Sequence, residues 1–315
     1  MLNTGTLPAG AVLAMVSSVF ASGLHAEHRS FDVSPGSRFV LDADWGQVEV
    51  RAREGAVVEV DVERAEKVLL EFDQVDDTVT VRSETRNKGV FGWFRNNRGP
   101  APVFRVTVPT RTDLDLTTVG GNVEVADLDG SVMVSTVGGR IALGEIVGDV
   151  ESRTAGGSIE VAAASGTVRA NTTGGSIRIG RAAGGVEAKT TGGSIHIEES
   201  GGPVVARTTG GSMELGRVHG SIDARTTGGS IGAALAGQPG GDSDLRTTGG
   251  SIHLAIAEDI ALDLDARTIG GRVSVDIPVT NQQMEGKSKL AASVNGGGPG
   301  LTLRTTGGSV QVRGM

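Results

Sequence analysis

Hydrophobic and polar residues alternate strictly in the last two thirds of the chain, in short runs separated by glycine. In the stretch 174–191, Ile177 and Ile179 flank the polar Arg178, and a second run of the same kind begins at Val186. A period of two is typical of a β-strand with one buried face. We therefore expect two strands in each such unit, with glycine at both bends.

These units repeat along the chain. The spacing between these di-glycine pairs is 18 residues as far as Gly228, then 21 as far as Gly270, and a longer gap precedes the last pair. The pairs begin at Gly120, Gly138, Gly156, Gly174, Gly192, Gly210, Gly228, Gly249, Gly270 and Gly307. A two-strand unit buries only one face of each strand, so it needs neighbours that stack in register. We predict an all-β fold, a β-solenoid of 18-residue two-strand coils over residues 113–315. Ten coils at about 4.8 Å each would make a rod roughly 50 Å long.

Two parts of the chain depart from the period. Residues 27–112 read as alternating strands without a repeat, with turns such as Pro35-Gly36 and Glu54-Gly55. We expect this non-repetitive N-terminal β segment to cap the first coil and hide its edge. Residues 279–300 interrupt the period before the last unit, and we expect a loop or a distal cap there.

Two columns of polar residues accompany the repeat. The residue two positions before every di-glycine pair is threonine, which by parity faces inward, where its hydroxyl can satisfy a backbone carbonyl or the next hydroxyl. One residue earlier lies an outward column of Arg153, Asn171, Lys189, Arg207, Arg225, Arg246, Arg267 and Arg304. Acids stand two positions before that column, at Glu151, Glu187, Asp223, Asp244 and Asp265. The pattern fits a solvated face of paired charges, with a stripe that binds polyanions as the alternative.

Composition narrows the possible functions. Glycine supplies 50 of 315 residues, tyrosine and cysteine are absent, and every Phe and Trp lies at or before Phe104. The core of the repeats must therefore be thin. A formal charge of −8 argues against binding nucleic acid through a broad basic surface. The lack of cysteine excludes a disulfide framework, a thiolate zinc site and a cysteine nucleophile.

The N-terminus has features of a secretory signal peptide. An apolar, small-residue stretch at 9–23 is followed by Leu24-His25-Ala26, which fits a cleavage site. We therefore expect residues 1–26 to be a signal peptide and the protein to be exported, to the periplasm, cell surface or medium. No Lys or Arg precedes the apolar run, so a misplaced start codon or a disordered tail stays an alternative. The stretch is shorter than the ~20 residues that span a bilayer.

The repeats lack the residue patterns expected of a metal site or a catalytic site, which favours a structural protein. Calcium-binding nonapeptide rolls need an aspartate in each turn, but here serines such as Ser176 and Ser194 stand there. His196 and His253 share an outward column three coils apart, too far to hold one metal ion. The repeats lack the aromatic rings that stack on sugars. We therefore expect no metal, cofactor or catalytic residue, and keep a polysaccharide-active solenoid enzyme only as an alternative.

One segment, residues 86–102, combines basic and aromatic side chains. Four bases and three rings occur there without an acid, at Arg86, Lys88, Phe91, Trp93, Phe94, Arg95 and Arg98. Such a loop suits contact with an anionic membrane surface, a glycan or a protein of the envelope. The alternative is that its rings fold back and plug the end of the solenoid.

Several segments together resemble a known family. SRFVLDADWGQVEVRARE, VTVPTRTDLDLTTVGGNVEV and NGGGPGLTLRTTGGSVQV, with the T-x-G-G-x-I units between them, resemble the bacterial putative-adhesin family of β-strand-repeat proteins, a domain of unknown function. The resemblance covers about residues 37–315. It implies an exported, non-enzymatic module with a structural or adhesive function in the cell envelope. The alternative is an envelope-stress or signalling accessory protein that contacts membrane or a partner through residues 86–102.

Overall fold

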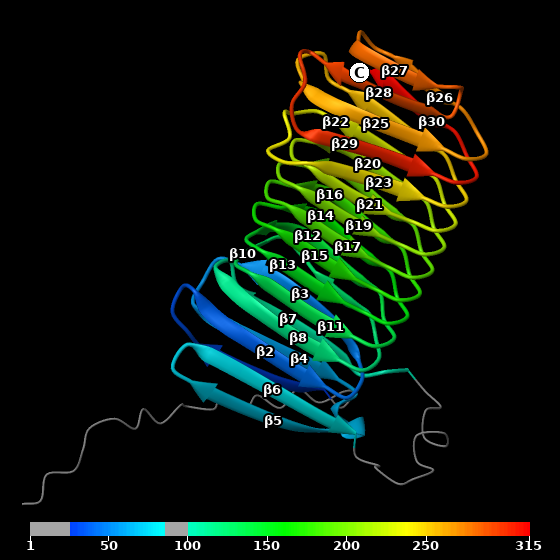
Figure 1. Ribbon diagram of the computed structural model, residues 1–315. Coiled ribbons are helices and arrows are strands. Elements are labelled where there is room, and N and C mark those ends of the chain that lie inside the picture. The colour runs from blue at the N-terminus through cyan, green and yellow to red at the C-terminus, as the bar shows by residue number, and fades with distance from the viewer. Residues whose placement is uncertain (1–25, 86–99) are drawn as a thin grey trace, which may run out of the picture.

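Alternating strands dominate the computed structural model, which describes residues 26–85 and 100–315 (Figure 1). These residues form β-strands and one 3-10 helix, η1 (Ala65–Lys67), and the described part contains no α-helix. The strands belong to two sheets of fifteen strands each, named here sheet A and sheet B. The prediction of an all-β solenoid is confirmed.

Sheet A runs the length of the molecule. In spatial order it contains β1 (Glu27–Asp32), β4 (Val57–Glu63), β7 (Val103–Pro109), β3 (Gln47–Arg53), β9 (Val123–Val125), β12 (Ile141–Val147), β14 (Ile159–Ala164), β16 (Ile177–Ala182), β18 (Ile195–Ser200), β20 (Met213–Val218), β22 (Ile231–Leu235), β24 (Ile252–Ile256), β30 (Val310–Gly314) and β26 (Val273–Asp276). The short β10 (Leu128–Asp129) pairs with β12 beside this path.

Sheet B lies against sheet A and also extends along the whole length of the molecule. In spatial order it contains β5 (Val68–Val75), β6 (Thr78–Thr85), β2 (Ser37–Ala43), β8 (Thr112–Thr118), β11 (Val132–Thr136), β13 (Val150–Arg153), β15 (Val168–Asn171), β17 (Val186–Lys189), β19 (Val204–Arg207), β21 (Ile222–Arg225), β23 (Ser243–Thr247), β29 (Gly300–Thr305), β25 (Leu262–Thr268), β28 (Lys289–Val294) and β27 (Thr280–Glu285). At about 4.8 Å per strand the fifteen strands extend over roughly 70 Å.

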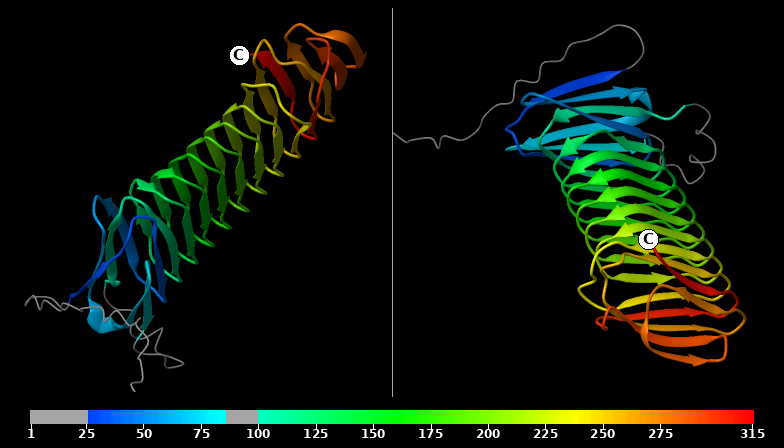
Figure 2. Two further views of the ribbon diagram at one scale, coloured as in Figure 1. Left: turned by 90° about the vertical axis from the view of Figure 1, so that its left-hand side faces the viewer. Right: turned by 90° about the horizontal axis from the view of Figure 1, so that it is seen from above.

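Each coil contributes one strand to each sheet, and successive coils stack in parallel with the register of the repeat (Figure 2). Ile159, Ile177 and Ile195 are direct neighbours across three strands of sheet A. Their side chains are at most 1% exposed, as is Ala188 on the facing sheet B. The core between the sheets is therefore a narrow, continuous stack of aliphatic side chains.

The di-glycine pairs form one corner of each coil, between a strand of sheet B and the next strand of sheet A. At the second glycine the backbones of neighbouring coils touch: a Cβ added to Gly193 would lie 2.0 Å from the carbonyl oxygen of Gly175. The first glycine, Gly192, has its nearest contact at 3.4 Å. Glycine is thus required at the second position by steric contact.

The inward threonine column locks this corner. The Thr190 hydroxyl donates to the Gly175 carbonyl of the preceding coil at 2.8 Å and accepts from the Gly193 N–H at 3.3 Å. The same pair of bonds recurs at Thr172, Thr208 and Thr226. Of the two partners expected for these hydroxyls, the structure selects the carbonyl.

The order of coils in space departs from their order in the chain at both ends. The last coil, β29 with β30, lies between β23–β24 and β25–β26. The first coil, β2 with β3, likewise lies between β6–β7 and β8–β9. Both terminal coils are therefore interior layers of the rod.

Antiparallel strands terminate both ends of sheet B and the near end of sheet A, whereas the far end of sheet A is the parallel strand β26. Residues 279–300 hold the hairpin β27–β28, and β28 pairs antiparallel with β25 at the far end of sheet B. At the near end, β1 and β4 in sheet A and β5 in sheet B are antiparallel to their neighbours. The N-terminal segment thus contributes coil-like strands as well as these outer strands.

Candidate functional site

The basic aromatic segment joins β6 to β7 and takes the place that a di-glycine corner has in the regular coils. Its candidate contact residues, Arg86, Lys88, Phe91, Trp93, Phe94, Arg95 and Arg98, lie outside the described residues. Their proposed contact function stays a prediction.

The returning end of this segment is described and is held in place. Lys67 Nζ donates to the Pro100 carbonyl at 2.7 Å, and Arg64 Nη1 donates to the Ala101 carbonyl, also at 2.7 Å. Arg64 directly precedes η1 and Lys67 is its last residue, just before β5 begins. The segment therefore rejoins the fold beside the N-terminal end of the rod.

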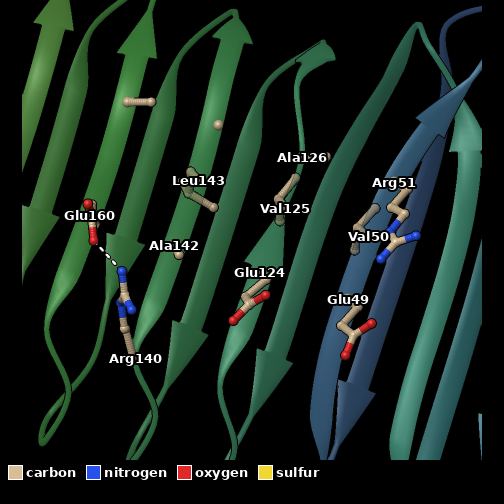
Figure 3. A pocket seen from close by; sticks show the side chains of 12 residues that line it. Glu49, Val50, Arg51, Glu124, Val125, Ala126, Arg140, Ala142, Leu143 and Glu160 are labelled. Carbon is tan, nitrogen blue, oxygen red and sulfur yellow. Dashed lines mark hydrogen bonds and ion pairs between the residues drawn. The ribbon is translucent and has the colours of Figure 1, made fainter.

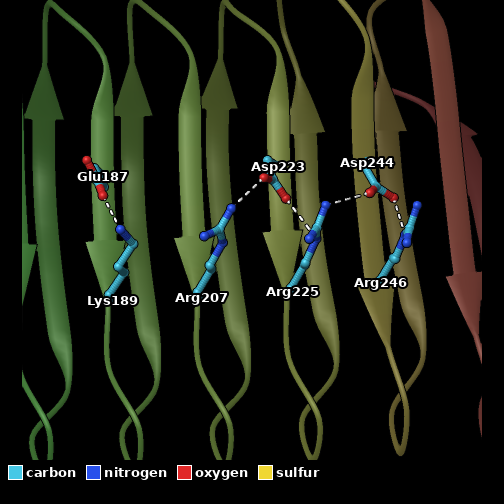
Figure 4. Close-up of polar contacts among 7 residues, drawn as sticks. All are labelled: Glu187, Lys189, Arg207, Asp223, Arg225, Asp244 and Arg246. Atoms are coloured by element: carbon cyan, nitrogen blue, oxygen red, sulfur yellow. Dashed lines mark hydrogen bonds and ion pairs between the residues drawn. The ribbon is translucent and has the colours of Figure 1, made fainter.

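The charged columns on the outer face of sheet B form a connected network (Figure 4). Asp223 contacts Arg207 at 2.9 Å and Arg225 at 3.1 Å, and Asp244 contacts Arg225 at 3.0 Å and Arg246 at 2.7 Å. Each carboxylate lies between two guanidinium groups, so the repulsion expected within a column of like charge is offset. This geometry favours the solvated face of paired charges over a free basic stripe.

Two acids on the outer faces of the sheets, Glu187 and Glu199, have lowered pKa values because cations hydrogen-bond to them. The Lys189 ammonium lowers the pKa of Glu187 on the same strand. On sheet A, Arg217, 2.8 Å away, lowers the pKa of Glu199, and His219 adds to the effect. The ionised form is favoured at both sites, as expected for structural ion pairs and unlike a general acid.

A shallow hollow of about 360 Å³ lies on the outer face of sheet A (Figure 3). Its lining includes the small side chains of Ala142 and Ala162 and the carboxylates of Glu49, Glu124 and Glu160. Glu160 pairs with Arg140, while Glu49 accepts from Arg105 at 3.2 Å. Two of the carboxylates are therefore neutralised by arginine, and the hollow lacks an aromatic ring among its lining residues.

The outward histidines lie where the repeat predicts. His196, Glu214, Gly232 and His253 occupy successive register positions on sheet A, which confirms that the two histidines are three coils apart. His196 Nδ1 lies 3.4 Å from Glu214. Within residues 26–85 and 100–315, no group of three or more His, Asp or Glu side chains is placed to hold a metal ion.

The corner serines are structural. The Ser176 hydroxyl accepts from the Ser194 N–H at 3.2 Å, and the same bond recurs two coils later, where the Ser212 hydroxyl accepts from the Ser230 N–H. Sequence reasoning missed an equivalent on the opposite corner. There, Asp149 accepts from the Thr167 N–H at 2.7 Å, and this bond lowers the pKa of Asp149. The spacing of 18 residues between acceptor and donor was the available signal.

Comparison with known proteins identifies the family. The family model described as Toastrack DUF4097 matches residues 37–313. No helix in the described part of the chain is long and apolar enough to span a membrane. No curated protein matches the chain.

Three solved structures are similar at low identity. A putative cell adhesion protein from Clostridium sporogenes ATCC 15579 has 8% identity and a TM-score of 0.25, with 92% of this chain and 100% of that chain covered. A putative adhesin from Parabacteroides merdae ATCC 43184 has 12% identity and a TM-score of 0.39, with 76% of this chain and 96% of that chain covered. A putative adhesin from Bacteroides fragilis NCTC 9343 has 13% identity and a TM-score of 0.32, with 92% of this chain and 97% of that chain covered. Because the family match extends from the first coil to the last, the chain belongs to the Toastrack DUF4097 family.

Proposed function

We propose that this protein is an exported, non-catalytic β-solenoid that serves as a structural or adhesive module of the bacterial cell envelope. The supporting observation is that the polar residues that repeat with the coils already form hydrogen bonds and ion pairs within the fold. Thr190 and Ser176 hold backbone groups of the corners, and Asp223 and Asp244 are bound between arginines. A rod built in this way presents long, uniform faces, which suit extended contact better than conversion of a small substrate.

Cell fractionation tests the export that this proposal requires. Cells that produce the full chain with a C-terminal epitope tag are fractionated, and intact cells are also treated with protease. We expect the tag in the envelope fraction or medium, on a chain that lacks residues 1–26. Full-length protein confined to the cytosol would contradict the proposal.

Adhesion is tested separately by attachment of cells with and without the protein to coated surfaces. An adhesive function predicts that deletion reduces attachment and that the intact gene restores it. Equal attachment, combined with weaker resistance of the envelope to detergent, would leave a structural function alone.

A second candidate is an envelope-stress or signalling accessory that contacts membrane or a protein through residues 86–102. It is favoured by the replacement of a tight corner by a long connection whose return is held by Arg64 and Lys67. The test compares Trp93→Ser/Phe94→Ser with Ile269→Ser, which alters an exposed apolar residue at a regular corner. Binding to anionic liposomes or to envelope extract should fall only in the double variant, with melting unchanged. A lower melting temperature of the double variant would mean that the rings pack on the rod.

A further inference from the structure

The two sheets end unevenly at the N-terminal end of the rod. Counting outward from the coil β2–β3, sheet A has three more strands, β7, β4 and β1, whereas sheet B has two, β6 and β5. Among the described residues, strand β1 therefore has no strand of sheet B opposite it. Strand β5 is the outermost labelled strand at this end in Figure 1.

The inner face of this uneven end is only partly buried. Phe31 on β1 meets Phe72 on β5 with ring centroids 6.2 Å apart, and Leu70 packs beside them, also partly buried. The Arg29 guanidinium lies 5.6 Å from the Phe72 centroid and pairs with Glu27 at 3.0 Å. Similar inward positions in the middle of the rod are at most a few per cent exposed. The described strands thus leave the core only partly covered along one strand position, although Gln74 of β5 donates to the Asp32 carbonyl of β1 at 2.7 Å across this end.

The edge that borders this opening is long and regular. Residues Leu69–Val75 of β5 pair with β6 without a register shift, and no strand of the described residues lies on their far side. Its outward side chains include Leu69 and Val75, which are 51% and 61% exposed, with the acids Glu71 and Asp73 between them. The edge at the opposite end of sheet B, β27, is interrupted by a register shift between Thr280 and Gln283. Such irregularity protects edges against pairing, and β5 lacks it.

We infer that β5 accepts an extended segment of a partner polypeptide as one further strand of sheet B, opposite β1. Main-chain hydrogen bonds to the β5 edge supply affinity, and alternate side chains supply specificity. Inward residues of the segment are apolar, because they face Phe31, Leu70 and Phe72. Outward residues follow the order apolar, basic, basic, apolar, to match Leu69, Glu71, Asp73 and Val75.

A single strand fits this position better than a second copy of the chain. If β5 paired with β5 of a second copy about a two-fold axis, the second copy's β4, which lies opposite its β5, would fall beside the first copy's β4. That place is already occupied by β1. The inference goes beyond the proposed adhesive function and is independent of export, because the binding can be measured with the purified full chain.

The test measures fluorescence anisotropy of a labelled peptide, Val-Leu-Ile-Lys-Val-Arg-Ile-Val, on the full chain. Two control peptides carry either Glu in place of Lys and Arg, or N-methyl groups on alternate amides that block strand pairing. We expect saturable binding of the first peptide and at least tenfold weaker binding of both controls. Absence of saturable binding, or equal binding of the N-methylated peptide, would overturn the inference.

Variants of the chain locate the binding. Asp73→Lys, whose cross-strand neighbour is the neutral Thr80, should weaken the basic peptide at least tenfold and favour the acidic one. The matched control Glu124→Lys, on the interior strand β9, should leave binding unchanged. Equal affinity of wild type and Asp73→Lys would overturn the inference.

Two further outcomes would identify another occupant and also overturn it. The first is tighter peptide binding after residues 86–99 are replaced by a glycine–serine linker of equal length, which would mean that the chain fills the position itself. The second is oligomers in sedimentation velocity that Asp73→Lys disperses, which would mean that a second copy does so.

Discussion

At the scale of single residues, the solenoid depends on groups that let neighbouring backbones touch. In the regular coils the second glycine of the corner, such as Gly193, lies against a carbonyl of the neighbouring coil, and the inward threonine, here Thr190, bonds to that same carbonyl. These two columns therefore fix the separation of the coils at this corner. The exposed residue between them, such as Thr191, has no part in this contact with the core.

Substitutions within one corner distinguish the contributions of its two glycines to stability. Gly193→Ala would place a Cβ 2.0 Å from the Gly175 oxygen, so the coils must move apart and several hydrogen bonds must lengthen. We expect a loss of about 2–4 kcal/mol of unfolding free energy, as for severe steric overpacking. Gly192→Ala, with its nearest contact at 3.4 Å, should cost less than about 1 kcal/mol. Urea unfolding of both variants decides, and equal losses would refute the steric argument.

The threonine column gives a second prediction at this scale. Thr190→Val keeps the shape of the side chain but removes the hydroxyl, so the Gly175 carbonyl and the Gly193 N–H each lose a partner at a buried position. We expect a cost of about 1–3 kcal/mol. Thr191→Val alters the exposed neighbour and should stay within about 0.5 kcal/mol of wild type. Thermal melts that rank the variants in the reverse order would contradict the assignment of inward and outward threonines.

At the scale of elements, the two corners of a coil are built differently. One uses glycine, threonine and serine, whereas the other includes carboxylates that accept N–H groups of the next coil. Asp149 accepts both the N–H and the hydroxyl of Thr167, and Asp113 accepts the N–H of Ser131. At Asp149, where the pKa is lowered by these bonds, we therefore expect the corner to respond to acid.

The pH dependence of stability tests this difference. The pKa of Asp149 is lowered in the folded state, chiefly by the Thr167 N–H. Its stabilising contribution is therefore present above the unfolded pKa of about 3.9 and is lost as the pH falls through the folded value. Asp149→Asn keeps an acceptor without the charge, so it should lose less stability than wild type between pH 6 and pH 3. Glu124→Gln should keep the wild-type difference in urea midpoint, and an unchanged difference in Asp149→Asn would count against the bond.

The sequence was sufficient to predict the coils but not their order. The 18-residue period specified strands, inward isoleucines, the threonine column and the paired charges, because each follows from local parity. The position of β29–β30 between two earlier coils could not be read in the same way. Its Leu303 and Val312 stack on neighbours much as the other coils do, so the local pattern permits any coil to lie on any other.

The candidate site was predicted less completely than the fold. The basic and aromatic composition of residues 86–102 singled out one segment, but composition alone cannot state what such a segment contacts. The open position beside β5 could not be predicted from the sequence pattern, because Phe31 and Phe72, which meet there, are 41 residues apart in the chain. Their approach follows only from the order of strands at the end of the rod, which is a property of topology.

At the scale of the whole molecule, both terminal coils are interior layers. β29 is flanked by β23 and β25, and β2 is flanked by β6 and β8, so each pairs on two sides. In stacked repeats the stability of a layer comes largely from its interfaces with neighbours. The last coil of the chain is therefore held as firmly as the middle ones, whereas β1 and β26 are the outermost strands of sheet A and β5 and β27 those of sheet B.

This arrangement predicts an unusual order of local opening in hydrogen exchange. Chain ends commonly exchange first, but amides of β29 should be protected about as strongly as those of β23, because both strands are paired on two sides. Amides of β27 should exchange fastest in sheet B, since this strand is outermost, exposed at every residue and interrupted by a register shift. Deletion of residues 300–315 should in addition expose β25 and β23 together, because it removes the layer between them. Fast exchange throughout β29, at the rate of β27, would show that the last coil does not lie inside the rod.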